Sequence, residues 1–224
     1  MAAATDRMTQ ASSKSDERAA NAGGLAAFQR ARRLVLALLI AAIFSVLLFG
    51  QSLFPPDTIV HETLEMLGNA LIFCGIVGRL WATLYIGGRK SEAIIVSGPY
   101  SITRNPLYVF STVAAVGVGA QTGSLVAALC VGIFCAAAFH VVILREERHL
   151  REMFGAAYAD YLRRVPRFWP APGLYDEGEP SGFRPRLLLT TLLDGMVFLL
   201  AAPAFELIDA LQQSGILPVL FRMP

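Results

Sequence analysis

Two polar clusters interrupt an otherwise apolar chain, and their residue types could bind or position charged groups. The first cluster, Gly98–Tyr108, reads Gly-Pro-Tyr-Ser-Ile-Thr-Arg-Asn-Pro-Leu-Tyr and contains Arg104. The second is the run Arg145-Glu146-Glu147. The fork of an arginine matches a carboxylate, and glutamates accept hydrogen bonds or balance a cation. We therefore predict that the chain folds to bring these two clusters together.

The composition indicates a membrane protein. Hydrophobic residues make up 55% of the 224 residues, charged residues 16%, and the mean hydropathy is +0.54, whereas soluble domains carry roughly 25% charged residues. The net charge of +2 is too small to indicate nucleic-acid binding. Cys74, Cys130 and Cys135 lie in apolar blocks without the paired spacing of a metal site, so we predict no metal.

Several apolar segments must position the clusters, and we predict an all-α integral membrane fold with about five transmembrane helices. We expect a disordered cytosolic tail at 1–33, a membrane domain at 34–211 and a short tail at 212–224. The first helix, 34–54, is long enough to span a bilayer, and we expect it to be retained. The other predicted helices are 64–86, 107–120, 125–144 and 187–211.

The runs 107–120 and 125–144 together are too long for one crossing, and the first is short for a full crossing. A tight helical hairpin with its tip at Thr122-Gly123 resolves this conflict. Both outer ends of the hairpin then lie at the same face of the membrane. Asn105 is predicted to cap the first of these helices, because Pro106 suits the first helical position.

After the hairpin, apolar residues from Leu150 to Leu162 recur at spacings of three and four. This spacing predicts a cytosolic amphipathic helix. Three and four residues before Leu150 stand Glu147 and Glu146. Both carboxylates therefore fall on or beside the inward face of that helix.

The positive charges predict the topology. Of the 19 Lys and Arg residues, 17 lie in the N-terminal tail, in 87–105 or in 145–186. By the positive-inside rule these segments face the cytoplasm. We therefore expect an integral protein of the bacterial inner (plasma) membrane, with its N-terminus and both clusters cytoplasmic.

Arg79 is a charge within the second predicted span. Its side chain could extend to the nearby head groups. Alternatively, it could face a ligand inside the bundle, because an ionisable residue within the membrane is costly. The sequence leaves both possibilities open.

These motifs together resemble the isoprenylcysteine carboxyl methyltransferase family, which is related to the membrane phospholipid N-methyltransferases. The resemblance covers roughly residues 60–170. It implies an integral membrane enzyme that binds S-adenosylmethionine near the cytosolic face and takes a lipophilic acceptor from the bilayer, without a metal. It rests on Gly98-Pro99-Tyr100, Arg104-Asn105-Pro106-Leu107-Tyr108, Glu146-Glu147, Phe154-Gly155, Tyr158 and Val165-Pro166-Arg167-Phe168.

Under this resemblance, eight residues are expected to bind the cofactor: Tyr100, Arg104, Asn105, Tyr108, His140, Glu146, Glu147 and Tyr158. Arg104 can pair with the cofactor carboxylate, while Glu146 or Glu147 can bind the ribose hydroxyls or the ammonium. The tyrosines offer faces to the adenine or the sulfonium, or else anchor the chain at the membrane interface. His140 either contacts the cofactor or packs between helices.

Methyl transfer is an in-line displacement that depends on alignment more than on acid-base chemistry. A carboxylate acceptor is already nucleophilic and needs a cation to hold it, and we predict Arg167 or Arg79 for this catalytic role. Two residues depart from the family pattern. Asn105 replaces a histidine but can still donate and accept hydrogen bonds, whereas Phe110 replaces a small residue and should narrow the hairpin packing or the pocket.

The predicted function is transfer of a methyl group to a lipophilic acceptor, with carboxyl O-methylation of an isoprenoid-type or other lipophilic acid as the leading reaction. The alternatives are N-methylation of a phospholipid amine, a sterol-reductase-like activity with a nicotinamide cofactor, and a non-catalytic scaffold. Gly117 and Gly119 favour close helix packing, although such a pair has a cofactor role in the phospholipid enzymes.

Overall fold

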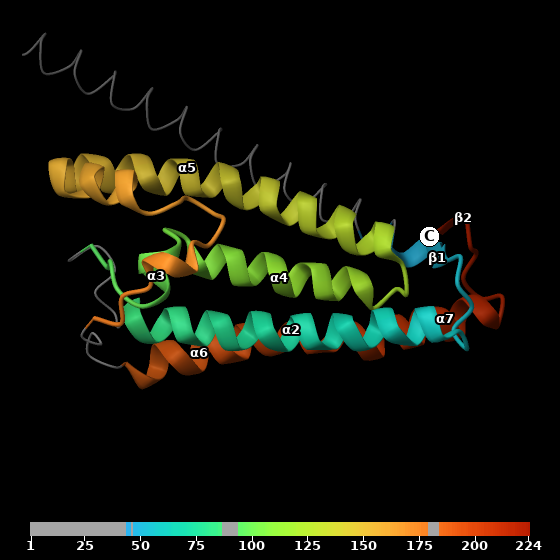
Figure 1. Ribbon diagram of the computed structural model, residues 1–224. Coiled ribbons are helices and arrows are strands. Elements are labelled where there is room, and N and C mark those ends of the chain that lie inside the picture. The colour runs from blue at the N-terminus through green and yellow to red at the C-terminus, as the bar shows by residue number, and fades with distance from the viewer. Residues whose placement is uncertain (1–43, 46, 87–93, 179–183) are drawn as a thin grey trace, which may run out of the picture. The chain divides into compact units, whose positions relative to one another are not determined.

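Helices form most of the described chain in the computed structural model (Figure 1). The structure describes residues 44–45, 47–86, 94–178 and 184–224. The chain divides into two compact units, Met1–Val46 and Leu47–Pro224, and the second contains all the elements below. The predicted tail at 1–33 and most of the predicted helix at 34–54 lie outside the described residues.

Three helical stretches are long and apolar enough to cross a membrane: Ile59–Ile86, Leu125–Arg164 and Pro185–Gln213. The prediction of a mostly helical membrane protein is therefore confirmed, while the number of five crossings stays a prediction. The stretches correspond to α2 (Ile59–Ile86), α5 (Leu125–Arg164) and the series α6 (Pro185–Met196), η2 (Val197–Leu200) and α7 (Ala201–Gln213). Shorter helices are α3 (Pro99–Ile102), α4 (Pro106–Ala120) and the 3-10 turn η1 (Pro172–Leu174).

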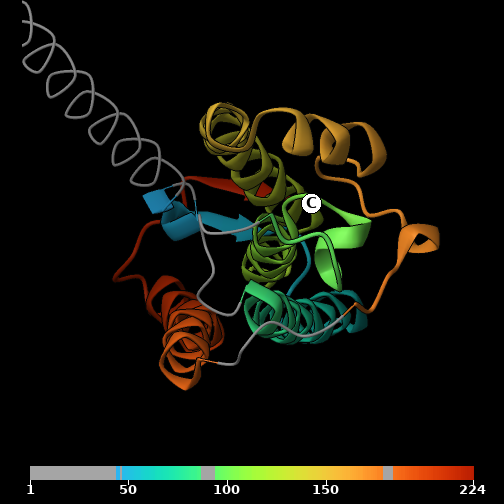
Figure 2. The ribbon, with the colours of Figure 1, turned by 90° about the vertical axis from the view of Figure 1, so that its left-hand side faces the viewer.

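The bundle is layered, with α4 between α5 and α2, and with α6 packed along the other side of α2 (Figures 1 and 2). Glycines permit the close approach of α2 and α4. A Cβ added at Gly75 would lie 2.6 Å from the Cβ of Ala114, and one at Gly117 would lie 2.5 Å from the carbonyl oxygen of Gly68. On the other side of α4, a Cβ at Gly119 would lie 2.7 Å from the α5 backbone. Close packing therefore explains Gly117 and Gly119.

Phe110 of α4 packs against α2 and does not line the cavity described below. Its ring lies over Gly78, where an added Cβ would stand 2.1 Å from the ring, and makes an edge contact with Trp81 at 6.2 Å between centroids. The absent side chain at Gly78 thus provides the room that the large ring requires.

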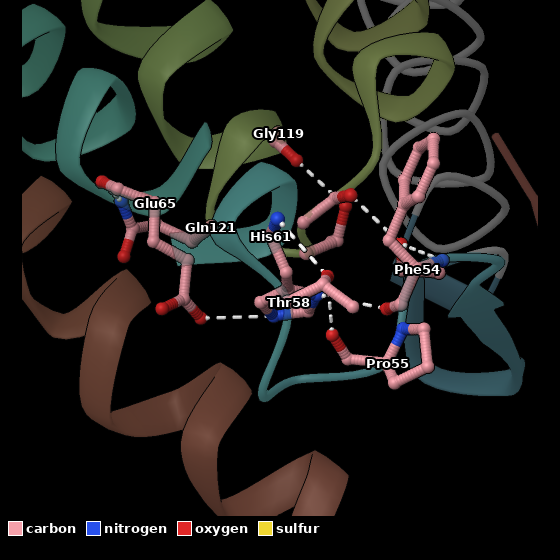
Figure 3. Close-up of polar contacts among 10 residues, drawn as sticks. Phe54, Pro55, Thr58, His61, Glu65, Gly119 and Gln121 are labelled. Atoms are coloured by element: carbon pink, nitrogen blue, oxygen red, sulfur yellow. Dashed lines mark hydrogen bonds and ion pairs between the residues drawn. The ribbon is translucent and has the colours of Figure 1, made fainter. Parts of the chain in front are cut away.

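The hairpin has its turn at the predicted position, between Ala120 and Leu125 (Figure 3). Gly123 adopts a positive φ of 64°, a conformation that glycine reaches without steric cost. Its carbonyl accepts a hydrogen bond of 2.7 Å from Ser52. Beside the turn, the buried ring of His61 lies between the carbonyl of Phe54 at 3.1 Å and the carboxylate of Glu65 at 3.2 Å.

Two short strands lie where the sequence predicted the end of a helix and a C-terminal tail. β1 (Gly50–Ser52) pairs in parallel with β2 (Phe221–Met223), with Gly50 opposite Phe221. The expected helix at 34–54 therefore does not continue to its predicted end, and part of the expected tail at 212–224 forms a strand. Gly50 has a low helix propensity, and the side-chain amide of Gln212 donates to the carbonyl of Leu48 at 2.9 Å, which holds the two segments together.

The predicted amphipathic helix is continuous with the second helix of the hairpin, and both belong to α5. α5 runs from the hairpin through both glutamates and changes direction only at Gly155, whose φ of 55° and ψ of −125° are not helical (Figure 2). The second part of α5 then carries Tyr158 and Tyr161, both buried against Val165. The prediction ended the membrane helix where the composition changes from apolar to charged, at Arg145, although no turn signal precedes Gly155.

Gly123→Ala should destabilise the protein by at least about 2 kcal/mol, because the new side chain would occupy a positive φ and meet the His61 ring. The measurement is thermal unfolding in detergent, with Gly173→Ala as the matched control because nothing lies within 4 Å of that position. Equal unfolding temperatures for the two variants would contradict the packing of this turn.

Candidate functional site

A cavity of about 660 Å³ lies at the end of the bundle where the two polar clusters meet. Its walls come from α2, α3, α4, α5 and α6. All the predicted cofactor-binding residues except His140 line it, and so does Arg79. The apolar part of the wall includes Leu107, Phe139, Leu150 and Phe154. The structure therefore brings the two clusters together in one cavity.

Glu147 is the centre of this arrangement. Its side chain is only 5% exposed, and one carboxylate oxygen, Oε1, lies 2.9 Å from Nη1 of Arg104. The other oxygen, Oε2, accepts a hydrogen bond of 3.0 Å from Nη2 of Arg167, whose Nε is 3.1 Å from Oε1. One buried carboxylate thus binds two guanidinium groups, which compensates for the cost of removing its charge from water.

The backbone joins the same segments. The carbonyl of Pro166 accepts from the amide of Arg104 at 2.9 Å, and the hydroxyl of Tyr161 donates to the carbonyl of Tyr100 at 2.7 Å. Asn105 precedes α4 as predicted, but it makes no side-chain cap. Its side-chain amide instead donates to the carbonyl of Arg167 at 2.8 Å. Asn105 therefore fixes the loop after α5 against the first motif.

Three polar atoms of the cavity residues remain without a hydrogen-bond partner in the described part of the chain. They are the hydroxyl of Tyr100, Nε of Arg104 and Nε of Arg79, and all three are buried. Burial raises the pKa of Tyr100, with smaller contributions from Tyr161 and Glu146, so this hydroxyl remains a proton donor at neutral pH. Nearby, the hydroxyl of Tyr108 donates to Glu146 at 2.9 Å. The residues that line the cavity thus carry three buried donors without a partner among the described residues.

Arg167 and His140 are placed differently from the expectation. Arg167 does not line the cavity, and its guanidinium is bound to Glu147. The hydrogen bond with Glu147 raises the pKa of Arg167. His140 is exposed, because the inward stripe of α5 runs through Phe139, Ile143 and Glu147 at spacings of four. The structure therefore does not bring either side chain to the cavity.

Several cavity residues were not among the predicted site residues, and Tyr161 and Thr191 are two of them. Tyr161 lies on the second part of α5, and its spacing of three from Tyr158 was the available signal. Thr191 is contributed by α6. Its hydroxyl within an apolar run was the available signal, but nothing in the sequence indicated that α6 packs on α2.

Comparisons with known proteins identify the class. A family model described as phospholipid methyltransferase matches residues 63–157. The chain is 34% identical to the cobalt-zinc-cadmium resistance protein CzcN of Cupriavidus metallidurans over 175 residues, or 78% of this chain and 80% of the relative. It is 26% identical to protein-S-isoprenylcysteine O-methyltransferase B of Arabidopsis thaliana over 138 residues, which cover 57% of this chain and 70% of the relative.

A further relative is the nickel-cobalt-cadmium resistance protein NccN of Alcaligenes xylosoxydans xylosoxydans, 38% identical over 136 residues, which cover 61% of this chain and 63% of the relative. No solved structure matches the chain. Within the described residues, no three His, Cys, Asp or Glu side chains gather as a metal site would require.

The chain thus combines a helical bundle and a cavity at its polar end with relatives that are named as methyltransferases. The chain belongs to the family of membrane methyltransferases that is represented by the phospholipid methyltransferases and the isoprenylcysteine O-methyltransferases, with the CzcN protein among its relatives. The resemblance inferred from the two motifs is thereby confirmed. The matched residues 63–157 contain both motifs, whereas α6 and α7 lie beyond them.

Glu147→Gln should lower the free energy of unfolding by about 3 kcal/mol, because it leaves Arg104 and Arg167 without their shared carboxylate in a buried site. Thermal unfolding in detergent measures this loss. Glu152→Gln, on an exposed position of the same helix, is the matched control. Unfolding of E147Q at the same temperature as E152Q would contradict the central role of Glu147.

Proposed function

We propose that this protein transfers a methyl group from S-adenosylmethionine to a lipophilic acceptor in the membrane. The leading reaction is carboxyl O-methylation of an isoprenoid-type or other lipophilic acid. The observation that carries the proposal is the position of Arg104. One guanidinium nitrogen is fixed on Glu147, while its Nε is buried without a partner among the described residues of the cavity.

The residues of the cavity fit this cofactor. A cavity of about 660 Å³ lies in the size range of small-molecule sites. Nε of Arg104 and the hydroxyl of Tyr100 are donors suited to a carboxylate. Glu146 provides an acceptor for an ammonium or a ribose hydroxyl, and Tyr158 provides an aromatic ring for a cation or the adenine. When bound, S-adenosylmethionine supplies an electrophilic methyl group on its sulfonium.

The protein's own contribution is to position the reactants. Glu147 orients Arg104, and the hydrogen bond from Tyr108 orients Glu146. The apolar wall, which includes Phe139 and Leu150, suits a lipophilic acceptor and excludes water from it. Alignment of this kind accounts for much of the rate of a displacement, and a carboxylate acceptor requires no general base.

A second candidate is N-methylation of a phospholipid amine, which the description of the matching family model favours. The Arabidopsis relative, named for O-methylation of isoprenylcysteine, favours the carboxyl reaction. A scaffold of the same fold without turnover is the third possibility. The three differ in where a transferred methyl group would be found.

In purified protein, S-adenosylmethionine should bind measurably by calorimetry, and Arg104→Ala should weaken binding at least about tenfold because a charge-assisted hydrogen bond is lost. Arg163→Ala is the matched control, since that side chain is 76% exposed. No binding to the wild type, or equal binding to R104A, would overturn the cofactor site.

The acceptor class is tested with methyl-labelled S-adenosylmethionine and a membrane lipid extract. Label released as methanol by mild base identifies carboxyl methyl esters, whereas base-stable label in a phospholipid headgroup identifies N-methylation. Binding of the cofactor without any transferred label would favour the scaffold.

The names of two bacterial relatives connect them with heavy-metal resistance. We propose that the methylated acceptor contributes to the same property in cells that contain this chain. Cells that express R104A in place of the wild type should then grow less well in cobalt, zinc or cadmium, with R163A cells as the control. Equal growth of the two strains would separate the methyl transfer from resistance.

A further inference from the structure

Arg79 places a positive charge in the apolar helix α2, at a position that lines the cavity. Its Nε is buried and has no hydrogen-bond partner among the described residues. The guanidinium lies 5.8 Å from the centroid of the Phe198 ring, on the turn after α6. A charge at this depth is costly unless it has a partner. The Arg79 side chain thus lines the cavity and has one hydrogen-bonding group without a partner among the described residues.

The surroundings of Arg79 are built by α6. Thr191 lines the same cavity, where its hydroxyl donates to the carbonyl of Leu187 at 3.0 Å and accepts a hydrogen bond of 3.2 Å from Thr83 of α2. Gly195 then permits close contact with Ile76, because an added Cβ there would stand 3.3 Å from the Ile76 side chain. Asp194 acts on Arg79 electrostatically. Among the ion pairs of the described residues, however, none joins the two within 4.0 Å.

The cavity therefore has two distinct polar regions on different helices. Arg104 and Glu147 form one, from the motif loop and α5, and both belong to the segment that the family model matches. Arg79 and Thr191 form the other, from α2 and α6; Arg79 lies within the matched segment, and α6 lies beyond it. Because Arg104 and Glu147 suit the cofactor, the second region is available for recognition of an acceptor.

We propose that Arg79 and Thr191 form the acceptor subsite, in which Arg79 binds the anionic end of a single-chain amphiphile and α6 forms one wall for its apolar chain. This inference rests on the proposed methyl transfer and specifies the substrate class of that site. The anionic end of the acceptor is an oxyanion, either a carboxylate or a phosphate. A planar guanidinium binds either group through paired hydrogen bonds.

Methylation of a carboxylate acceptor is a displacement at the methyl carbon of S-adenosylmethionine. A carboxylate oxygen forms the new bond to the methyl carbon, the carbon–sulfur bond breaks with its electron pair going to sulfur, and no proton is released. The ester is neutral, so it loses its ionic attraction to Arg79. The product should therefore bind more weakly than the substrate, which favours its release into the membrane.

The test measures binding without S-adenosylmethionine, so its failure is distinguishable from failure of the cofactor site. Radiolabelled oleate, oleyl phosphate and methyl oleate are titrated onto the full chain in an uncharged maltoside detergent. Wild type should bind at least one of the two anions about tenfold more tightly than methyl oleate. Preference for oleate identifies a carboxylate acceptor, and preference for oleyl phosphate alone identifies a phosphate headgroup.

Arg79→Gln should abolish the preference for the anion, Arg79→Lys should retain part of it, and the exposed control Arg163→Gln should retain all of it. Thr191→Val, which conserves the shape of the side chain, should leave the preference for the anion intact, because the Thr191 hydroxyl donates its proton to the carbonyl of Leu187. Thermal unfolding of each variant shows whether it is folded, and R79K keeps the test valid if R79Q is not. Equal binding of anion and ester by the wild type would overturn the subsite, and so would an unchanged preference for the anion in folded R79Q. If R79Q does not fold, an unchanged preference in R79K has the same meaning.

Discussion

The arrangement of the site depends on one buried carboxylate that two arginines share. Glu147 joins the loop before α4, the helix α5 and the irregular segment after α5, which are distant in sequence. Removing such a charge from water is costly, and each guanidinium offsets part of that cost. Because Arg104 and Arg167 approach the carboxylate separately, the geometry fixes both flanking segments at once. The cavity exists because these segments are held at its rim.

Much of this could be predicted from the sequence. The spacing around Leu150 placed Glu146 and Glu147 on an inward face, and the distribution of positive charge placed both motifs at one end of the bundle. Those inferences use periodicity and charge, which are local properties of the chain. The hairpin followed from helix length in the same way, since two apolar runs with four polar or small residues between them have few other solutions.

The features that sequence reasoning missed depend on contacts between distant segments. Nothing local indicates that Arg167 binds Glu147 and not an acceptor, because Pro166 and its neighbours have no periodic structure. The pairing of β1 with β2 is likewise non-local, since a three-residue strand exists only beside its partner. His140 was expected at the cavity because it lies near the glutamates along the chain, but nearness in sequence does not decide which face of a helix carries a side chain.

The shortness of α4 has a consequence for the membrane itself. Its 15 residues rise about 22 Å, whereas the hydrocarbon of a bilayer is about 30 Å thick. The length of α4 is therefore about 8 Å less than that thickness, and the turn that contains Gly123 follows at its end. The turn residues there are buried, and main-chain oxygens that belong to the turn and to Pro224 bond with Ser52 and Ser124. The segments around the strand pair therefore supply protein partners to polar groups of the turn, so these groups would not depend on water even if the turn lay below the membrane surface.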